Sequence, residues 1–148
     1  MLANSRFTVI EDFGHHPTAL AETLRSFRVR YPGALLTAVF EPRSNTACRR
    51  AMQDGFMRAL AQADEVYLGP VNRPERLKPE DRFDPEAVTQ QLETQGVEAH
   101  FAATNAAVLE TLLANTVATD AGKPRVVVFF TNGSFDGIIE KFVAAVKE

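Results

Sequence analysis

The sequence has little that would support a disulfide, a thiolate metal cluster or a membrane anchor. Its 148 residues include a single cysteine, Cys48, which excludes an intramolecular disulfide and a zinc site built from several thiolates. No apolar run is long enough to cross a membrane, and residues 1–6 lack the apolar core of a secretory signal. These absences predict a cytoplasmic protein without a membrane partner.

Two further absences bear on function. Sixteen Lys and Arg residues against nineteen Asp and Glu residues give a formal net charge of -3. This balance argues against a nucleic-acid partner, because nucleic-acid-binding domains usually carry a basic surface. The pattern G-x-x-x-x-G-K-S/T does not occur, so the sequence has no P-loop with which to hold the phosphates of a nucleotide.

The length and the hydrophobic pattern predict one domain spanning residues 1–148. A chain of this length, with 45% hydrophobic residues, can bury one core but is too short for two ordinary domains. Five apolar runs predict strands at residues 7–10, 34–40, 66–68, 97–102 and 125–130. Amphipathic stretches predict helices at residues 17–31, 52–63, 85–95, 106–117 and 138–146.

The alternation of strands and helices predicts an α/β fold. We expect a Rossmann-like, doubly wound, mainly parallel sheet of five to six strands with helices on both faces. Residues 69–84 interrupt the alternation with three prolines among charged residues, and they are interpreted as a solvated connection. In such sheets ligands bind beyond the carboxyl ends of the strands, which selects the polar segments 11–18, 41–49 and 131–137 as the candidate site.

The first of these segments contains an aspartate and two histidines. The carboxylate of Asp12 can accept hydrogen bonds from a ribose diol or cap a backbone amide, and the residue type alone favours capping. His15 and His16 are adjacent, so they make a poor metal pair, and we interpret one of them as the cap of the helix that begins at Pro17. A metal-dependent hydrolase built on these imidazoles lacks acidic partners at ligand spacing.

The second segment offers a guanidinium followed by short polar side chains. Arg43 can grip a carboxylate or phosphate through two parallel hydrogen bonds, with Ser44 and Asn45 beside it. Alternatively, Ser44 or Thr46 caps the next helix and Arg43 pairs with Glu41. Chemistry alone leaves both interpretations open.

The third segment carries two glycines. Gly133 and Gly137 permit close backbone approach and positive φ angles. Phe135 is interpreted as a core residue rather than a ring that stacks on a ligand.

Taken together, the three segments resemble a known family. Residues 11–18 read E-D-F-G-H-H-P-T and resemble the D-D-F/Y-A/G-H-H-P-T motif that opens the C-terminal domain of UDP-N-acetylmuramate ligases. Residues 41–46, E-P-R-S-N-T, are similar to the murein peptide ligase branch rather than to the Q-P-H-R-Y-T-R of muramate–alanine ligases. Residues 131–138, T-N-G-S-F-D-G-I, resemble that branch's S-N-G-G-F-G-G-I. The order and spacing of the motifs agree along nearly the whole chain.

The resemblance implies an ATP-dependent ligase of peptidoglycan recycling. Such an enzyme joins the tripeptide L-Ala-γ-D-Glu-meso-diaminopimelate to UDP-N-acetylmuramate through an acyl phosphate. This chain would be its third domain, without the N-terminal UDP-binding domain and the central ATPase domain of the same polypeptide. ATP and Mg²⁺ would be held mainly by the central domain, which carries the P-loop. The isolated domain is then expected to be inactive.

The resemblance also assigns contacts position by position. Three residues are implied to contact ATP: Asp12, Phe13 and His15. Five are implied to contact the peptide substrate: Arg43, Ser44, Asn45, Asn132 and Gly133. No catalytic or metal-binding residue is implied within this sequence. Three residues depart from the family pattern, which leaves their roles open: Glu11, Ser134 and Asp136. A second hypothesis, a non-catalytic α/β module that binds a nucleotide or a cell-wall peptide, stays open on the sequence.

Overall fold

The chain folds around one six-stranded sheet. The computed structural model describes residues 2–3, 6–13, 16–43, 47–71, 74–118, 122–131 and 133–147. The strands are β1 (Leu2–Ala3), β2 (Phe7–Asp12), β3 (Leu35–Phe40), β4 (Glu65–Leu68), β5 (Glu98–Phe101) and β6 (Arg125–Phe130). Their order in the sheet is β1-β2-β6-β3-β4-β5, with β1 antiparallel to β2 and the other pairs parallel. The predicted mainly parallel sheet is confirmed, and β1 is an addition that two residues could not signal.

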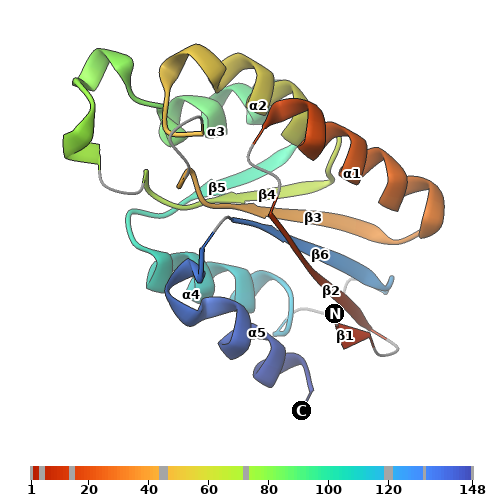
Figure 1. Ribbon diagram of the computed structural model, residues 1–148. Coiled ribbons are helices and arrows are strands. Elements are labelled where there is room, and N and C mark those ends of the chain that lie inside the picture. The colour runs from red at the N-terminus through yellow and green to blue at the C-terminus, as the bar shows by residue number, and fades with distance from the viewer. Residues whose placement is uncertain are drawn as a thin grey trace.

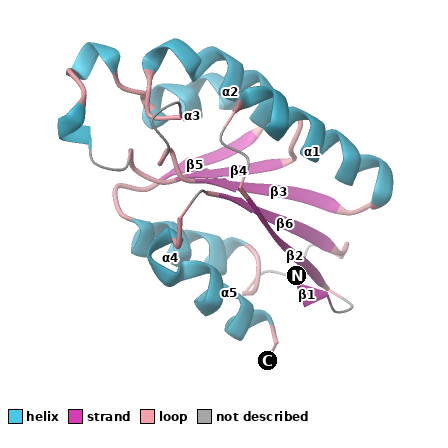
Figure 2. Cartoon of the chain, in the orientation of Figure 1, coloured by secondary structure: helices cyan, strands magenta, loops and turns pink. Residues whose placement is uncertain are grey.

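Helices cover both faces of the sheet (Figures 1 and 2). One face carries α1 (Pro17–Arg30), α2 (Gln53–Leu60) and α3 (Pro85–Thr94), and the other carries α4 (Asn105–Asn115) and α5 (Ile138–Val146). Each face has its own apolar cluster: Leu24 and Phe56 belong to the first, and Leu112 and Phe142 to the second. The doubly wound architecture is therefore confirmed. No helix within the described ranges is both long and apolar enough to cross a membrane.

The start of α1 follows the local sequence. Pro17 occupies the first turn, and His16 is the N-cap, whose Nδ1 accepts a hydrogen bond from the Thr18 amide at 3.3 Å. A proline needs no donor of its own at this position, and the cap satisfies an amide that the helix leaves unpaired. The capping role predicted for one of the two histidines is confirmed for His16.

The segment 69–84 corrects an expectation. Its middle is largely exposed, including short 3₁₀ turns at Pro74–Arg76 and Pro79–Asp81, but Phe83 is only 2% exposed. Its ring packs edge-on against Phe40 and Phe56, with centroids 5.9 and 6.1 Å away. The interpretation as a solvated connection fits the middle of the segment and is wrong at its end, where Phe83 is part of the core.

Strand register brings the polar segments together. In the aligned parallel strands, Asp12 lies beside Phe130, and Phe130 beside Phe40. The ladder continues one residue further, because the Thr131 amide donates to the Asp12 carbonyl at 3.1 Å and the Glu41 amide donates to the Phe130 carbonyl at 3.0 Å. The segments that follow β2, β6 and β3 therefore begin in one row at the carboxyl edge of the sheet.

Candidate functional site

The candidate site lies at the carboxyl edge, where β2, β6 and β3 end close to the start of α4 (Figure 1). The innermost polar group of the site is the buried carboxylate of Glu41. Glu41 is 3% exposed and accepts hydrogen bonds from the Thr131 hydroxyl at 2.5 Å and from Asn105 Nδ2 at 3.0 Å. These donors satisfy the buried carboxylate. The alternative that Arg43 pairs with Glu41 is not supported: among the described residues, the partners of the Glu41 carboxylate are the Thr131 hydroxyl and the Asn105 carboxamide.

Arg43 lies over the loop that follows β6. A Cβ atom added to Gly133 would stand 2.2 Å from Arg43 Nε and 2.6 Å from its Cδ. A side chain at position 133 would fit only if this guanidinium moved away, so glycine is what permits the close approach. The Gly133 amide in turn donates to the Thr131 hydroxyl at 3.1 Å. Two of the residues assigned to the peptide substrate, one from each loop, are thus in contact.

The loop after Gly133 has three consecutive residues with positive φ angles, two of which are not glycine. Phe135 and Asp136 have φ angles of 54° and 53°, and Gly137 has a φ angle of 76°. Aspartate tolerates this conformation better than most residues, and the Asp136 carboxylate accepts a hydrogen bond from Asn105 Nδ2 at 2.8 Å. The family pattern has glycine at this position, and the positive φ angle of Asp136 is one that glycine adopts readily. Phe135 is fully buried against Phe129, which confirms its interpretation as a core residue.

Asp12 and Phe13 lie at the end of β2, next to β6. Asp12 is half-buried, and its Oδ2 accepts a hydrogen bond from the Thr23 hydroxyl of α1 at 3.4 Å. It does not cap α1, because that position belongs to His16. Phe13 is 65% exposed. An exposed ring beside a carboxylate presents both an apolar face and an acceptor to a ligand above the strand ends.

Several predicted positions lie outside the described residues. These are His15, Ser44, Asn45, Thr46 and Asn132. The alternative that Ser44 or Thr46 caps the second helix finds no support, because α2 begins at Gln53 after the N-cap Met52, which makes no side-chain cap bond. The described part of the site presents three kinds of group: the Arg43 guanidinium, the Asp12 carboxylate and the exposed Phe13 ring.

Within the described ranges, no group of three or more His, Cys, Asp or Glu side chains is placed to hold a metal ion. The carboxylates of Glu41 and Asp136 come together only through Asn105, whose amide group lies between them.

A buried ion pair lies near the other end of the sheet. Arg125 pairs with Glu65, which also accepts from the Thr37 hydroxyl at 3.0 Å and from the Tyr67 hydroxyl at 3.3 Å. Burial raises the pKa of the Glu65 carboxyl, although the Arg125 charge opposes this, and burial also raises the pKa of the Tyr67 hydroxyl. Perturbed pKa values often mark functional sites, but this network is satisfied internally and is a structural element.

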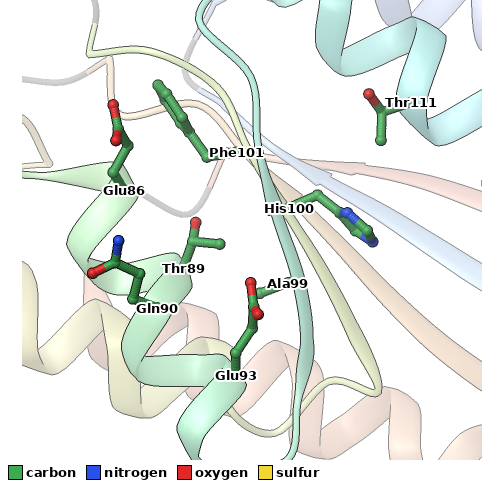
Figure 3. A pocket seen from close by; sticks show the side chains of 8 residues that line it. All are labelled: Glu86, Thr89, Gln90, Glu93, Ala99, His100, Phe101 and Thr111. Atoms are coloured by element: carbon green, nitrogen blue, oxygen red, sulfur yellow. The ribbon is translucent and has the colours of Figure 1, made fainter.

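A surface hollow of about 470 Å³ lies along the free edge of β5 (Figure 3). Glu86, Gln90 and Glu93 of α3 line one side, and His100 points away from α3, to the side on which Thr111 of α4 lies. No residue of the strand-end segments lines it. Charged side chains commonly protect the edge strand of a sheet from pairing with another chain. The carboxylates that line the hollow are explained by this role at the edge strand β5.

The chain matches a known family over most of its length. The model described as "Mur ligase, glutamate ligase domain" matches residues 1–133. The chain belongs to the Mur ligase family. The strand-end segments of this Mur ligase domain are therefore those of a ligase family, as the sequence motifs indicated.

Curated relatives match only part of this Mur ligase domain. The UDP-N-acetylmuramate–L-alanine ligase of Polaromonas sp. (strain JS666) is 45% identical over 65 residues, which are 44% of this chain and 14% of that enzyme. The match therefore covers about one seventh of the relative's length. These relatives are alanine ligases, whereas the motif at residues 41–46 resembles the murein peptide ligase branch.

Solved structures extend the likeness to nearly the whole chain. The murein peptide ligase of Psychrobacter arcticus has a TM-score of 0.71 at 22% identity, covering 96% of this chain and 28% of that one. A domain from Haemophilus ducreyi, described as belonging to a UDP-N-acetylmuramate:L-alanyl-γ-D-glutamyl-diaminopimelate ligase, has a TM-score of 0.67 at 23% identity. That match covers 96% of this chain and 93% of the Haemophilus domain. At these identities the likeness establishes the fold.

Proposed function

We propose that this Mur ligase domain is the C-terminal domain of an ATP-dependent ligase that joins the recycled tripeptide L-Ala-γ-D-Glu-meso-diaminopimelate to UDP-N-acetylmuramate. The observation that carries the proposal is the contact of Arg43 with Gly133. It unites two of the segments whose motifs resemble the murein peptide ligase branch. An arginine fork at this point suits the carboxylate of an incoming peptide.

The proposal divides the work between three domains of one polypeptide. This domain has no P-loop in its sequence, and the described ranges hold no metal-ligand cluster. The other two domains therefore hold UDP-N-acetylmuramate, the ATP phosphates and Mg²⁺, and the present domain closes over them. The match of 96% of this chain to only 28% of the Psychrobacter murein peptide ligase supports this division.

Nucleotide and peptide contact different parts of the carboxyl edge. Asp12, Phe13 and His15 contact the nucleoside of ATP from the end of β2, where the Asp12 carboxylate accepts hydrogen bonds from the ribose. The peptide is held by residues of the loops after β3 and β6: Arg43, Ser44, Asn45, Asn132 and Gly133.

The decisive experiment is Arg43→Ala in the full-length ligase. A desolvated charged contact is worth about 2–5 kcal/mol, so the KM for the tripeptide should rise by about 30-fold or more, while the KM for ATP stays close to that of the wild type. Arg58→Ala serves as the control, because Arg58 is exposed on α2. Unchanged tripeptide kinetics in Arg43→Ala would remove this residue from the site.

A second candidate function is the attachment of free L-alanine to UDP-N-acetylmuramate. The identity to the Polaromonas alanine ligase over 65 residues favours it. Steady-state assays of the wild-type ligase with L-alanine and with the tripeptide separate the two. Turnover of L-alanine alone would establish the second candidate, and a protein that binds these ligands without turnover of either would be a binding module.

A further inference from the structure

Asn105 lies outside the three segments that the sequence selected, yet it joins two of them. It is the first residue of α4 and is 7% exposed. Its side-chain amide donates to Glu41 Oε2 at 3.0 Å and to Asp136 Oδ2 at 2.8 Å. One NH₂ group thus bridges two carboxylates that lie 64 and 31 residues away along the chain.

The surroundings of Asn105 fix the orientation of its carboxamide. The preceding Thr104 caps α4 by accepting a hydrogen bond from the Ala107 amide at 3.1 Å, which anchors the first turn. The Asn105 Oδ1 atom is buried and has no hydrogen-bond partner in the part of the chain that the structure describes. It faces Gly69, where an added Cβ would stand only 2.7 Å away. The donor side of the carboxamide is therefore directed at the two carboxylates.

Both carboxylates lie next to groups assigned to the substrate. Glu41 precedes Arg43 by two residues, and it also binds the Thr131 hydroxyl, which accepts from the Gly133 amide. Asp136 fixes the far end of the same loop in its left-handed conformation. Asn105 therefore holds both sides of the contact between Arg43 and Gly133.

We propose that Asn105 is a positioning residue of the ligase. It holds the loops after β3 and β6 in the arrangement that places the Arg43 guanidinium where the anionic end of the incoming peptide binds. This inference rests on the proposed function. Without the Asn105 donors, no hydrogen-bond donor would lie between the carboxylates of Glu41 and Asp136. Their repulsion would then push apart the loop after β3, which carries Arg43, and the loop after β6.

The functional test uses Asn105→Ala and Asn105→Asp in the full-length ligase. Asn105 acts through Arg43, and misplacement of a substrate-holding group by about 1 Å can cost on the order of 100-fold; a smaller displacement corresponds to about tenfold. The KM for the tripeptide should rise by at least that factor, with the KM for ATP near the wild-type value, and Asn105→Asp should be more severe because it adds a third carboxylate. The matched control is Asn115→Ala, which changes the same residue type at the other end of α4, where Asn115 lies 3.5 Å from His100.

Two further measurements separate positioning from a general loss of structure. The double variant Asn105→Ala with Asp136→Ala should be no worse than the more severe single variant, since residues in one network are non-additive. In the 148-residue chain, Asn105→Ala should shift the NMR amide signals of Gly133 and Asp136, whereas Asn115→Ala should leave them in place. A tripeptide KM in Asn105→Ala equal to that in Asn115→Ala would overturn the proposal.

The amide signals also separate this proposal from the proposed function. If the wild-type ligase turns over no tripeptide, the proposed function fails. Amide shifts confined to the loop after β6 would then still support the bridging by Asn105, and unchanged signals would overturn that as well.

Discussion

Gly133→Ala is the sharpest perturbation of the site that the chain offers. The added methyl group would lie 2.2 Å from Arg43 Nε, and ordinary contacts of a Cβ begin at 3.4 Å. The guanidinium must therefore retreat by about 1.2 Å. It is the far end of a flexible side chain, so the backbone need not move, and we expect the free energy of unfolding to change by no more than about 1 kcal/mol.

A shift of this size matters for a binding group. Misplacement of a substrate-holding residue by about 1 Å can cost on the order of 100-fold in rate. We expect the KM for the tripeptide to rise between about tenfold and 100-fold in Gly133→Ala, with the KM for ATP unchanged. Steady-state kinetics of the full-length ligase and urea unfolding of the same preparation measure the two effects.

Gly96→Ala is the matched control for this experiment. Gly96 has a φ angle of 84° and no atom within 4 Å of an added Cβ. Its substitution should therefore cost about 1 kcal/mol of stability through backbone strain and leave the kinetics unchanged. The reasoning is refuted if Gly133→Ala keeps a wild-type KM for the tripeptide, or if Gly133→Ala still raises that KM when Arg43 is already alanine.

Two predictions concern the fold. Phe83→Ala should lower the free energy of unfolding by about 3–5 kcal/mol because it empties a ring site against Phe40 and Phe56; a loss below about 1 kcal/mol in urea unfolding would contradict its place in the core. Burial raises the pKa of Asp64, but hydrogen bonds from Arg28 and the Leu36 amide outweigh burial and lower the pKa below its ordinary 3.8. This contribution to stability is full above about pH 3.8 and is lost as the pH falls through the lowered pKa. Asp64→Asn should therefore flatten the fall in the urea midpoint between about pH 6 and pH 2, and equal slopes would exclude this role.

Most of the architecture could be predicted because its signals are local. The apolar run 125–130 predicted β6, and Pro17 with its preceding histidine predicted where α1 begins. The row of strand ends followed from the topology, so the contact between the loops after β3 and β6 was within reach of the sequence. β1 was not, because a two-residue strand has no periodicity.

The buried polar network could not be predicted. The sequence left open whether Glu41 pairs with Arg43, two residues away, whereas the donors seen in the structure come from Thr131 and Asn105. Asn105 gave no signal beyond its place after the capping Thr104. Gly69 looked like the start of a connection, yet its missing side chain leaves room for the Asn105 carboxamide.

The sequence by itself determined the family, the doubly wound sheet and the edge of the sheet proposed as the binding site, because motifs, periodicity and helix caps depend on neighbours along the chain. Only the tertiary structure decided which polar groups are buried and what holds Arg43 in place. That outcome depends on three loops meeting at one carboxamide, and a hydrogen bond between residues 64 positions apart leaves no trace in local sequence.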